Sequence, residues 1–167
     1  MKENPMRIIK IEKVILSCSG KDENLAKSKK LLEILSSRKA QIIASFKRIP
    51  DFDVSPGQEV GARVTMRGAS GVEMLRRLLG AVDNALKSKQ ISDNHFSFGI
   101  KEYIEIPGVE YHRDLGIRGL TVTVVFARSG LRVQRKKIKS GKVSKKQLIS
   151  KQEIIKYLED VFKTKIL

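Results

Sequence analysis

Segments with the apolar spacing of a helix and segments with the alternation of a strand follow one another along this chain. The order of these segments constrains the fold more than any single motif does. Apolar residues recur at helical spacing in three segments, which are residues 22–37, 70–86 and 150–162. Alternating or β-branched segments fill the gaps, clearly at residues 8–17, 60–66 and 120–126 and more weakly at residues 42–49, 96–106 and 132–138. Because strands and helices do not alternate regularly, the order predicts an α+β fold, with a mainly antiparallel sheet that helices cover on one face.

Capping signals mark two helix starts. Ser70 and Glu73 form a capping box before the second helix, and Ser150 and Glu153 form another before the third.

The chain of 167 residues is long enough for one domain with a real core, so we expect residues 1–167 to form a single domain. A sheet covered on one face leaves the other face free to bind a partner.

The positive charge of the chain is concentrated in one region. The net charge is +16, and the 38 residues between Asp114 and Glu153 carry 11 Lys or Arg and no acid. We call residues 132–149 the basic arm. Such a run is either a solvated arm or one that becomes ordered on a phosphate backbone. The excess of cations predicts a polyanionic partner.

The remaining composition excludes several classes of protein. Cys18 is the single cysteine, so no disulfide and no thiolate zinc site is expected, and packing is its predicted role. Apolar runs are too short for a membrane span, and the N-terminal segment carries Lys2 and Arg7 without the apolar stretch of a secretory signal. We expect a soluble protein of the cytoplasm with no metal and no cofactor.

No constellation for catalysis is visible. His95 and His112 stand in polar stretches, which is typical of surface residues rather than a catalytic pair. Gly20 and Lys21 follow a strand, but Ile15 and Asp22 occupy the positions where a nucleotide-binding loop needs Gly and Ser or Thr. The chain is therefore not expected to be an enzyme.

The aromatic content narrows the type of nucleic acid. Six Phe, three Tyr and no Trp, without the basic-Gly-aromatic-Gly signature, do not favour single-strand binding by stacking. No zinc-finger spacing or helix-turn-helix is present. A sheet and loops with Arg, Lys and Thr suit the shallow groove and phosphates of folded RNA.

Six short motifs occur in the order found in one family. They are Asn4-Pro5-Met6, the strand ending near Leu16, Val64-Thr65-Met66-Arg67-Gly68, Phe96-Ser97-Phe98-Gly99-Ile100, Ile106-Pro107-Gly108-Val109 and Gly116-Ile117-Arg118-Gly119-Leu120. Over nearly its whole length the chain resembles the universal large-subunit ribosomal protein L-five family, called L-eleven in eukaryotes. The N-terminal motif and the arm are similar to the archaeal and eukaryotic branch.

The resemblance implies a structural RNA-binding protein of the ribosomal central protuberance. Its implied partners are 5S rRNA, large-subunit rRNA, ribosomal protein L-eighteen, the small-subunit protein S-thirteen through a bridge, and P-site tRNA through a loop. In the family, the strand end with the T-x-R-G motif contacts 5S rRNA, so the resemblance assigns this role to Thr65 and Arg67. Gly68 allows the RNA to approach the backbone closely. The alternative is that Arg67 is a solvated strand end and Thr65 only a β-former.

The chain departs from the family pattern at three places. Ser17 replaces an Asn, and Ser36-Ser37-Arg38 replaces Thr-Gly-Gln, so an amide contact is lost while Arg38 offers a phosphate contact. The tRNA-facing loop is acidic, because Asp51 and Asp53 flank Phe52 where the family carries cations. We call residues 50–58 the acidic loop, and its carboxylates argue against a direct contact with tRNA phosphates.

These arguments predict an RNA interface, with two rival functions. Its residues are Arg38, Lys39, Lys47, Arg48, Arg63, Thr65, Arg67, Gly68, Arg132, Arg135, Lys136, Lys137 and Lys139, and the tRNA-proximal loop contains Pro50, Asp51, Phe52, Asp53, Val54 and Ser55. One rival is an architectural DNA-binding module, and the other is a small enzyme acting on RNA. The second lacks an acid-base or metal constellation in the sequence.

Overall fold

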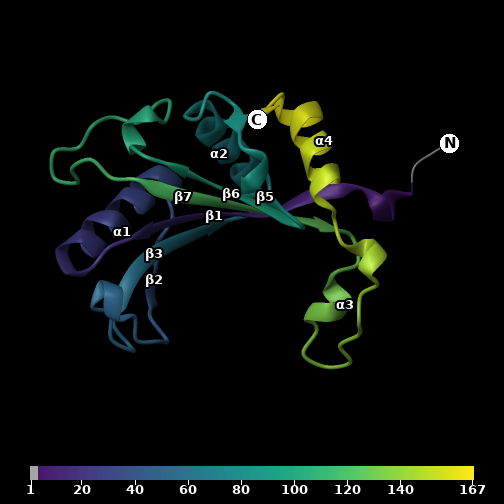
Figure 1. The fold of residues 1–167 in the computed structure, drawn as a ribbon, viewed down its shortest axis with the longest axis horizontal. Coiled ribbons are helices and arrows are strands. Elements are labelled where there is room, and N and C mark those ends of the chain that lie inside the picture. The colour runs from purple at the N-terminus through teal and green to yellow at the C-terminus, as the bar shows by residue number, and fades with distance from the viewer. Residues whose placement is uncertain (1–3) are drawn as a thin grey trace.

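The computed structural model describes residues 4–167, so Met1, Lys2 and Glu3 lie outside the described residues. Three helices of more than two turns and six strands of one sheet form its frame (Figure 1). The helices are α1 (Asp22–Ser36), α2 (Ala69–Gly80) and α4 (Lys151–Phe162). The sheet contains β1 (Ile9–Ser19), β2 (Gln41–Ala44), β3 (Glu59–Met66), β5 (Ile91–Ser92), β6 (His95–Ile100) and β7 (Leu120–Arg128).

Every pairing in the large sheet is antiparallel. The strand order is β2-β3-β1-β7-β6-β5, which places β1 and β7 at the centre. Two further short strands, β4 (Ala85–Leu86) and β8 (Lys165–Ile166), pair in parallel and fasten the C-terminus beside the turn that follows α2. The predicted α+β class with a mainly antiparallel sheet is confirmed.

Alternation along the strands separates a buried face from an open one. Val14 and Leu16 on β1 and Val122 and Val124 on β7 are fully buried, whereas the residues between them are not. This period of two is the one that β geometry imposes on a sheet with one covered face. We call the other side, which carries Ser17, Arg63, Thr65, Thr121 and Thr123, the open face.

The helices bury their apolar stripes against the covered face. In α1 the fully buried residues include Leu31 and Leu32, and α2 contributes Leu75 and Leu78 to the same core. On α4, the ring of Tyr157 meets Phe126 edge to face at a centroid distance of 5.5 Å. In Figure 1 α2 and α4 lie above the sheet, as the prediction of helices on one face requires.

A β-bulge in β1 explains how cations reach the open face at the N-terminal end of the strand. Strict alternation from Lys10 would turn Lys13 toward the core, but the pairing with β7 shifts register between Ile11 and Lys13. Such an extra residue re-aims the side chains that follow it. As a result Val14 is buried, while Lys13 shares the open face with Val125, its partner on β7.

The second helix differs from its prediction at both ends. Its N-cap is Gly68 with φ 70° and ψ −153°, so the capping box predicted for Ser70 and Glu73 is wrong. The helix ends at Gly80 rather than at residue 86, because Asp83 and Asn84 adopt positive φ values of 52° and 53° in a turn. The second capping box is confirmed, since Glu153 accepts the backbone N–H of Ser150 at 3.0 Å.

Three weak strand predictions also need correction. The segment 132–138 is not a strand, because Arg132–Arg135 forms a single helical turn, α3. The segment 42–49 pairs only over β2, and 96–106 pairs only to Ile100 before a 3-10 turn at Tyr103–Glu105. The side chains of residues 132–138 do not pack against a covered face of a sheet. Without such packing, β-branched residues alone do not stabilise a strand there. Among residues 4–167 no helix is long and apolar enough to cross a membrane.

Candidate nucleic-acid interface

The open face presents rows of polar side chains that run across the strands. One row joins Arg63 on β3 to Ser17 on β1, Thr121 on β7 and Gly99 on β6. Because directly paired residues point to the same side of a sheet, these groups lie in one line across four strands. The next row contains Thr65, Ile15, Thr123 and Ser97. Hydroxyls and an Arg in such rows can contact phosphates and 2′-hydroxyls together.

A cluster of cations lies where β3 ends and α2 begins. The Arg38 guanidinium donates to Ser70 Oγ at 3.0 Å, and Ser70 in turn donates to the backbone carbonyl of Arg67 at 3.3 Å. Ser70 therefore links the segment after α1 to the predicted T-x-R-G site instead of capping the helix. Arg67 and Lys39 are exposed beside this link.

Gly68 is required by the backbone at this cluster. Its φ and ψ fall in a region that only glycine occupies without strain, and its carbonyl accepts the backbone N–H groups of Gly71 and Val72. The turn directs the chain from β3 into α2 directly after Arg67. The structure thus brings Arg38, Arg67 and Gly68 together, although 30 positions of sequence separate the first from the last.

Two cations of the open face were missed from the sequence. Lys10 and Lys13 on β1 pair with Ala127 and Val125 of β7, and both share the side of the sheet that carries Thr121 and Thr123. The basic residues of β1 could have been noticed as outward members of an alternating strand. The bulge between Ile11 and Lys13 hid that signal, because it breaks the alternation.

The base of the basic arm is fastened to the body, because its C-terminal end is held against the end of β7. The largely buried Arg128 at the end of β7 donates to the carbonyls of Lys146 and Leu148 at 3.1 and 3.4 Å and pairs with Glu153 at 2.6 Å. Asn94 holds the same end, since its Oδ1 accepts the backbone N–H of Ile149 at 2.8 Å. The arm is therefore a closed loop with a fixed base, and its residues 132–140 are exposed.

One carboxylate pulls the arm toward the sheet. Both carboxylate oxygens of Glu12, in the bulge of β1, accept the guanidinium of Arg135 on α3, and Arg135 Nη2 lies 2.7 Å from Oε2. The hydrogen bond from Arg135 is the main cause that lowers the pKa of the Glu12 carboxyl, and the charges of Arg135, Lys13 and Arg67 act in the same direction while burial opposes them. The exposed fraction of the Glu12 side chain is 17%, against 56% for Arg135.

Removing this ion pair should loosen the arm. In Glu12→Gln we expect trypsin to cut within residues 132–139 about two- to fivefold faster at neutral pH, because half-exposed pairs stabilise by at most about 1 kcal/mol. Glu159→Gln, on an exposed position of α4, should leave the rate unchanged. Because the native pKa of Glu12 is depressed, the pair stabilises above the unfolded pKa and is lost as pH falls through the native value. Unchanged cleavage in Glu12→Gln would remove Glu12 from this role.

The acidic loop forms a second projection. It contains a 3-10 turn, Pro50–Phe52, and Lys21 Nζ holds it by donating to the carbonyls of Phe52 and, at 3.1 Å, Asp53. Val54 is buried and bridges to Ile49, so of the predicted loop residues it is the one turned away from solvent. Phe52 is 69% exposed, and Phe46 just before the loop is 95% exposed beside Lys47 and Arg48.

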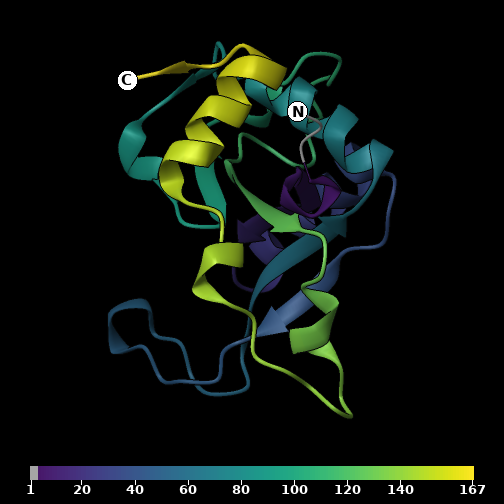
Figure 2. The same cartoon turned by 90° about the vertical axis from the view of Figure 1, so that its right-hand side faces the viewer.

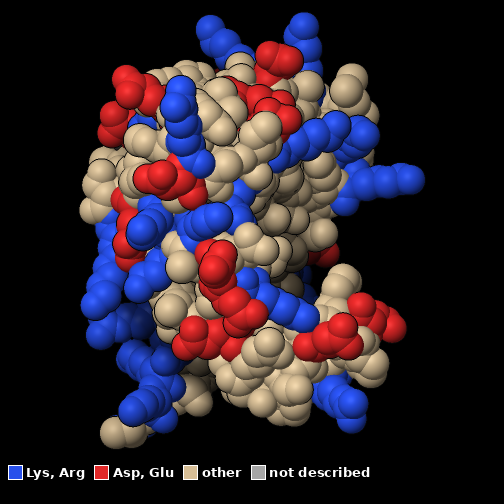
Figure 3. Space-filling view, turned by 90° about the vertical axis from the view of Figure 1, so that its left-hand side faces the viewer, with Lys and Arg blue, Asp and Glu red and all other residues tan. Residues whose placement is uncertain are grey.

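Both projections extend to the same side of the molecule. Figures 1 and 2 show the arm with α3 and the acidic loop below the sheet, away from α2 and α4. Figure 3 shows Lys and Arg gathered down one side of the face it draws, while Asp and Glu are spread from its top through its middle to the lower right. The uncovered side of the sheet, with its hydroxyls and cations, therefore faces the side to which both projections extend.

The groups considered for catalysis are not assembled into a site. Cys18 is buried, and burial raises the pKa of its thiol to about 11, which keeps it protonated at neutral pH. His95 and His112 are both exposed. Among residues 4–167 no three His, Cys, Asp or Glu side chains are grouped as metal ligands.

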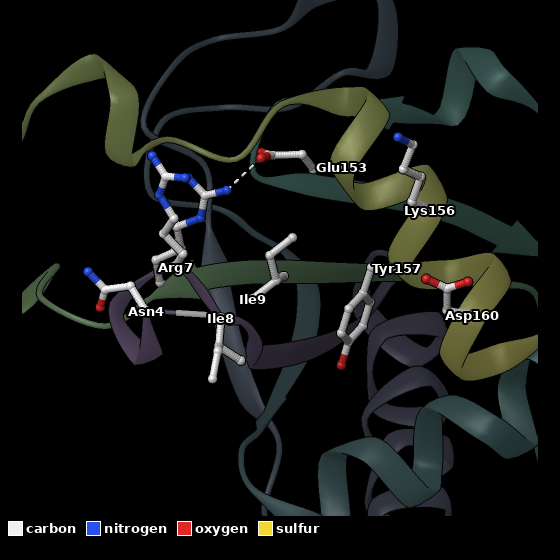
Figure 4. Close-up of a pocket in the computed structure, with 9 residues that line it drawn as sticks. Asn4, Arg7, Ile8, Ile9, Glu153, Lys156, Tyr157 and Asp160 are labelled. Atoms are coloured by element: carbon white, nitrogen blue, oxygen red, sulfur yellow. Dashed lines mark hydrogen bonds and ion pairs between the residues drawn. The ribbon is translucent and has the colours of Figure 1, made fainter. Parts of the chain in front are cut away.

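The hollow beside the N-terminal turn has the wrong chemistry for a polyanion. It measures about 670 Å³ and lies between the N-terminal turn and α4 (Figure 4). Arg7 and Lys156 line it, but so do Glu153 and Asp160, and Glu153 is already paired with Arg128. Its mixed charges make it a less suitable RNA site than the open face.

Comparison with known proteins identifies the family. The model of the ribosomal L5P family C-terminus matches residues 59–157. The chain is 39% identical over 161 residues to the large ribosomal subunit protein uL5 of Nanoarchaeum equitans, with 95% of each chain covered. It is 36% identical over 162 residues to uL5 of Archaeoglobus fulgidus, covering 95% of this chain and 90% of that one. The chain belongs to the ribosomal L5P family.

This L5P-family membership confirms the resemblance seen in the motifs and its archaeal character. A third relative, uL5 of Pyrobaculum aerophilum, is 38% identical over 164 residues and is covered to 92%. The matched range of the family model begins at β3 and includes Thr65, Arg67, Gly68 and the arm, whereas Arg38 and the acidic loop precede it. A family of ribosomal proteins is structural, so the prediction that the chain is not an enzyme is also confirmed.

Proposed function

We propose that this chain binds 5S rRNA in the large ribosomal subunit through its open face and basic arm. As an L5P-family member it is a structural protein of the large ribosomal subunit, associated with rRNA and located in the cytoplasm. The proposal adds which RNA it holds and with which surface. We further propose that residues 1–167 act as one RNA-binding domain.

A single observation carries this proposal: the uncovered side of a six-stranded sheet is lined by hydroxyls and cations between two projections. One hydrophobic core fills the covered face of the sheet. The helices α1, α2 and α4 pack against that face and leave the other face uncovered. A wide surface of hydroxyls and cations matches the shallow minor groove of folded RNA better than an aromatic platform would. The motif T-x-R-G ends at the edge of this surface.

Each predicted residue has a role in the proposal. Arg38, Lys39, Arg63 and Arg67 contact phosphates at the β3 side, and Thr65 offers its hydroxyl from the open face. Gly68 lets the RNA backbone approach the strand end, because no atom lies within 4 Å of where its Cβ would be. On the arm Arg132, Lys136, Lys137 and Lys139 contact phosphates. Arg135 positions the arm, since Glu12 already occupies its guanidinium.

The remaining partners rest on the family resemblance. They are ribosomal protein L-eighteen, large-subunit rRNA, the small-subunit protein S-thirteen and P-site tRNA. For tRNA, Phe52 in the acidic loop and Phe46 just before it offer exposed aromatic rings. Such rings can stack on bases where the carboxylates of Asp51 and Asp53 repel phosphates. Lys47 and Arg48 at the base of the loop supply the nearest positive charge.

Competition between nucleic acids tests the proposal. We expect the purified chain to bind 5S rRNA much more tightly than a random DNA duplex at physiological salt. Affinity should fall as salt rises, with a log–log slope that approaches −0.9 for each phosphate neutralised in duplex regions. Equal affinity for both nucleic acids would support the architectural DNA-binding rival, and a salt-independent affinity would contradict the phosphate contacts.

A further inference from the structure

A second hollow, of about 560 Å³, lies at the end of the open face. It lies where β1 and β6 end and β7 begins, next to the segment that leads into β7. Ser17, Ser19 and Thr121 supply hydroxyls, and Lys101 and Arg118 supply positive charge. No Asp or Glu is among the described residues that line it. The hollow continues the row Arg63, Ser17, Thr121 and Gly99, so it opens onto the surface proposed for RNA.

Gly99 forms the floor of this hollow without any need imposed by the fold. It lies inside β6, its φ is not positive, and a Cβ added to it would meet nothing within 4 Å. Gly119 is different, since a Cβ there would lie 2.9 Å from the carbonyl oxygen of Lys101. Glycine weakens a strand, and one with open space above it marks a place where a ligand approaches the backbone.

Arg118 makes one wall of the hollow rigid. Its guanidinium donates to the Leu115 carbonyl at 3.0 Å, to Ser28 Oγ at 3.3 Å and to Asn24 Oδ1 at 2.6 Å. These bonds join the segment before β7 to α1, so the wall is already in place without a ligand. Ile117, at the rim, is 64% exposed.

We propose that this hollow receives one unpaired nucleotide extruded from the bound RNA. The base lies on the bare Gly99 peptide, and its polar edge meets the hydroxyls of Ser17 and Thr121. Unstacked bases in loops and bulges are the parts of RNA that proteins bind in this way. Ser17 Oγ already donates to the backbone carbonyl of Thr121 at 3.3 Å, so toward a base it accepts, while the Thr121 hydroxyl can donate or accept. The inference rests on the proposed function and names a subsite of it.

A side chain that fills the floor tests this subsite. In Gly99→Val we expect affinity for 5S rRNA to fall about tenfold, the scale of one base contact, with the salt slope unchanged because no phosphate contact is removed. Valine favours strands, so thermal stability should not fall. His95→Val is the matched control, since it places the same side chain on the same strand and face, outside the hollow and at an exposed position with no proposed RNA contact. It should bind within about twofold of the unchanged protein.

The outcomes separate the subsite from the function. If the unchanged protein binds 5S rRNA and Gly99→Val binds equally well, the subsite is absent while the function stands. Equal losses in both variants would also overturn it, because the effect would then belong to the face as a whole. A lower salt slope in Gly99→Val would indicate a lost phosphate contact instead of a base. No binding of 5S rRNA by the unchanged protein would contradict the proposed function and this subsite with it.

Discussion

Replacing Lys136, Lys137 and Lys139 together by Gln is expected to weaken binding to 5S rRNA about 100-fold near 0.15 M salt. Each phosphate contact contributes about 0.9 to the slope of log affinity against log salt, so three contacts lower that slope by about 2.7. The three side chains are exposed on the arm, whose base is fixed by Arg128 and Asn94. Folding should be unaffected, and a salt titration of binding measures the slope.

The matched control removes the same charge elsewhere. Lys156, Lys163 and Lys165 are also exposed, but they lie on or just after α4, which covers the other face of the sheet. Their triple replacement by Gln should change affinity only slightly, through the smaller net charge. Equal losses in the two triple variants would show that overall charge, rather than the arm, determines binding.

Arg67→Ala should reduce the affinity for 5S rRNA by about 1–3 kcal/mol, which is roughly 5- to 150-fold. Arg67 follows β3 directly, and the Arg38–Ser70 link holds its backbone carbonyl in place. The backbone turn depends on Gly68 and not on the Arg67 side chain, so the variant should fold normally. The salt slope should decrease by about 0.9 if the side chain neutralises one phosphate.

An arginine on the opposite side serves as the reference for this variant. Arg76 is exposed on α2, which covers the core face of the sheet. Arg76→Ala removes the same charge, and we expect little loss of affinity in a filter-binding titration. If Arg67→Ala bound as tightly as Arg76→Ala, the alternative interpretation of Arg67 as a solvated strand end would be correct.

The strong periodic segments were predictable because burial itself imposes their pattern. Leu31, Leu75 and Val122 are core residues whose spacing follows the geometry of a helix or a strand packed on one side. The covered face of the sheet, and hence the existence of an open one, follows from that spacing. The end of α2 did not follow, because Asp83 and Asn84 adopt left-handed conformations that helical periodicity does not signal.

The parts of the candidate site that depend on distant contacts could not be predicted from the sequence. Glu12 and Arg135 are 123 positions apart, and Arg38 and Ser70 are 32 apart. The arm was expected to be either a solvated or an RNA-ordered segment, and its anchored base depends on Arg128 and Asn94, which no local pattern links to it. Lys13 was missed because a bulge places it on the open face.

Lysine labelling of the purified complex with 5S rRNA tests the central claim most directly. An amine-reactive reagent, read by mass spectrometry, reports which ammonium groups the RNA covers. The account predicts strong protection of Lys13, Lys136, Lys137 and Lys139 relative to the free protein, with unchanged labelling of Lys156, Lys163 and Lys165. Protection of the α4 lysines while the arm and the open face remain fully reactive would contradict it.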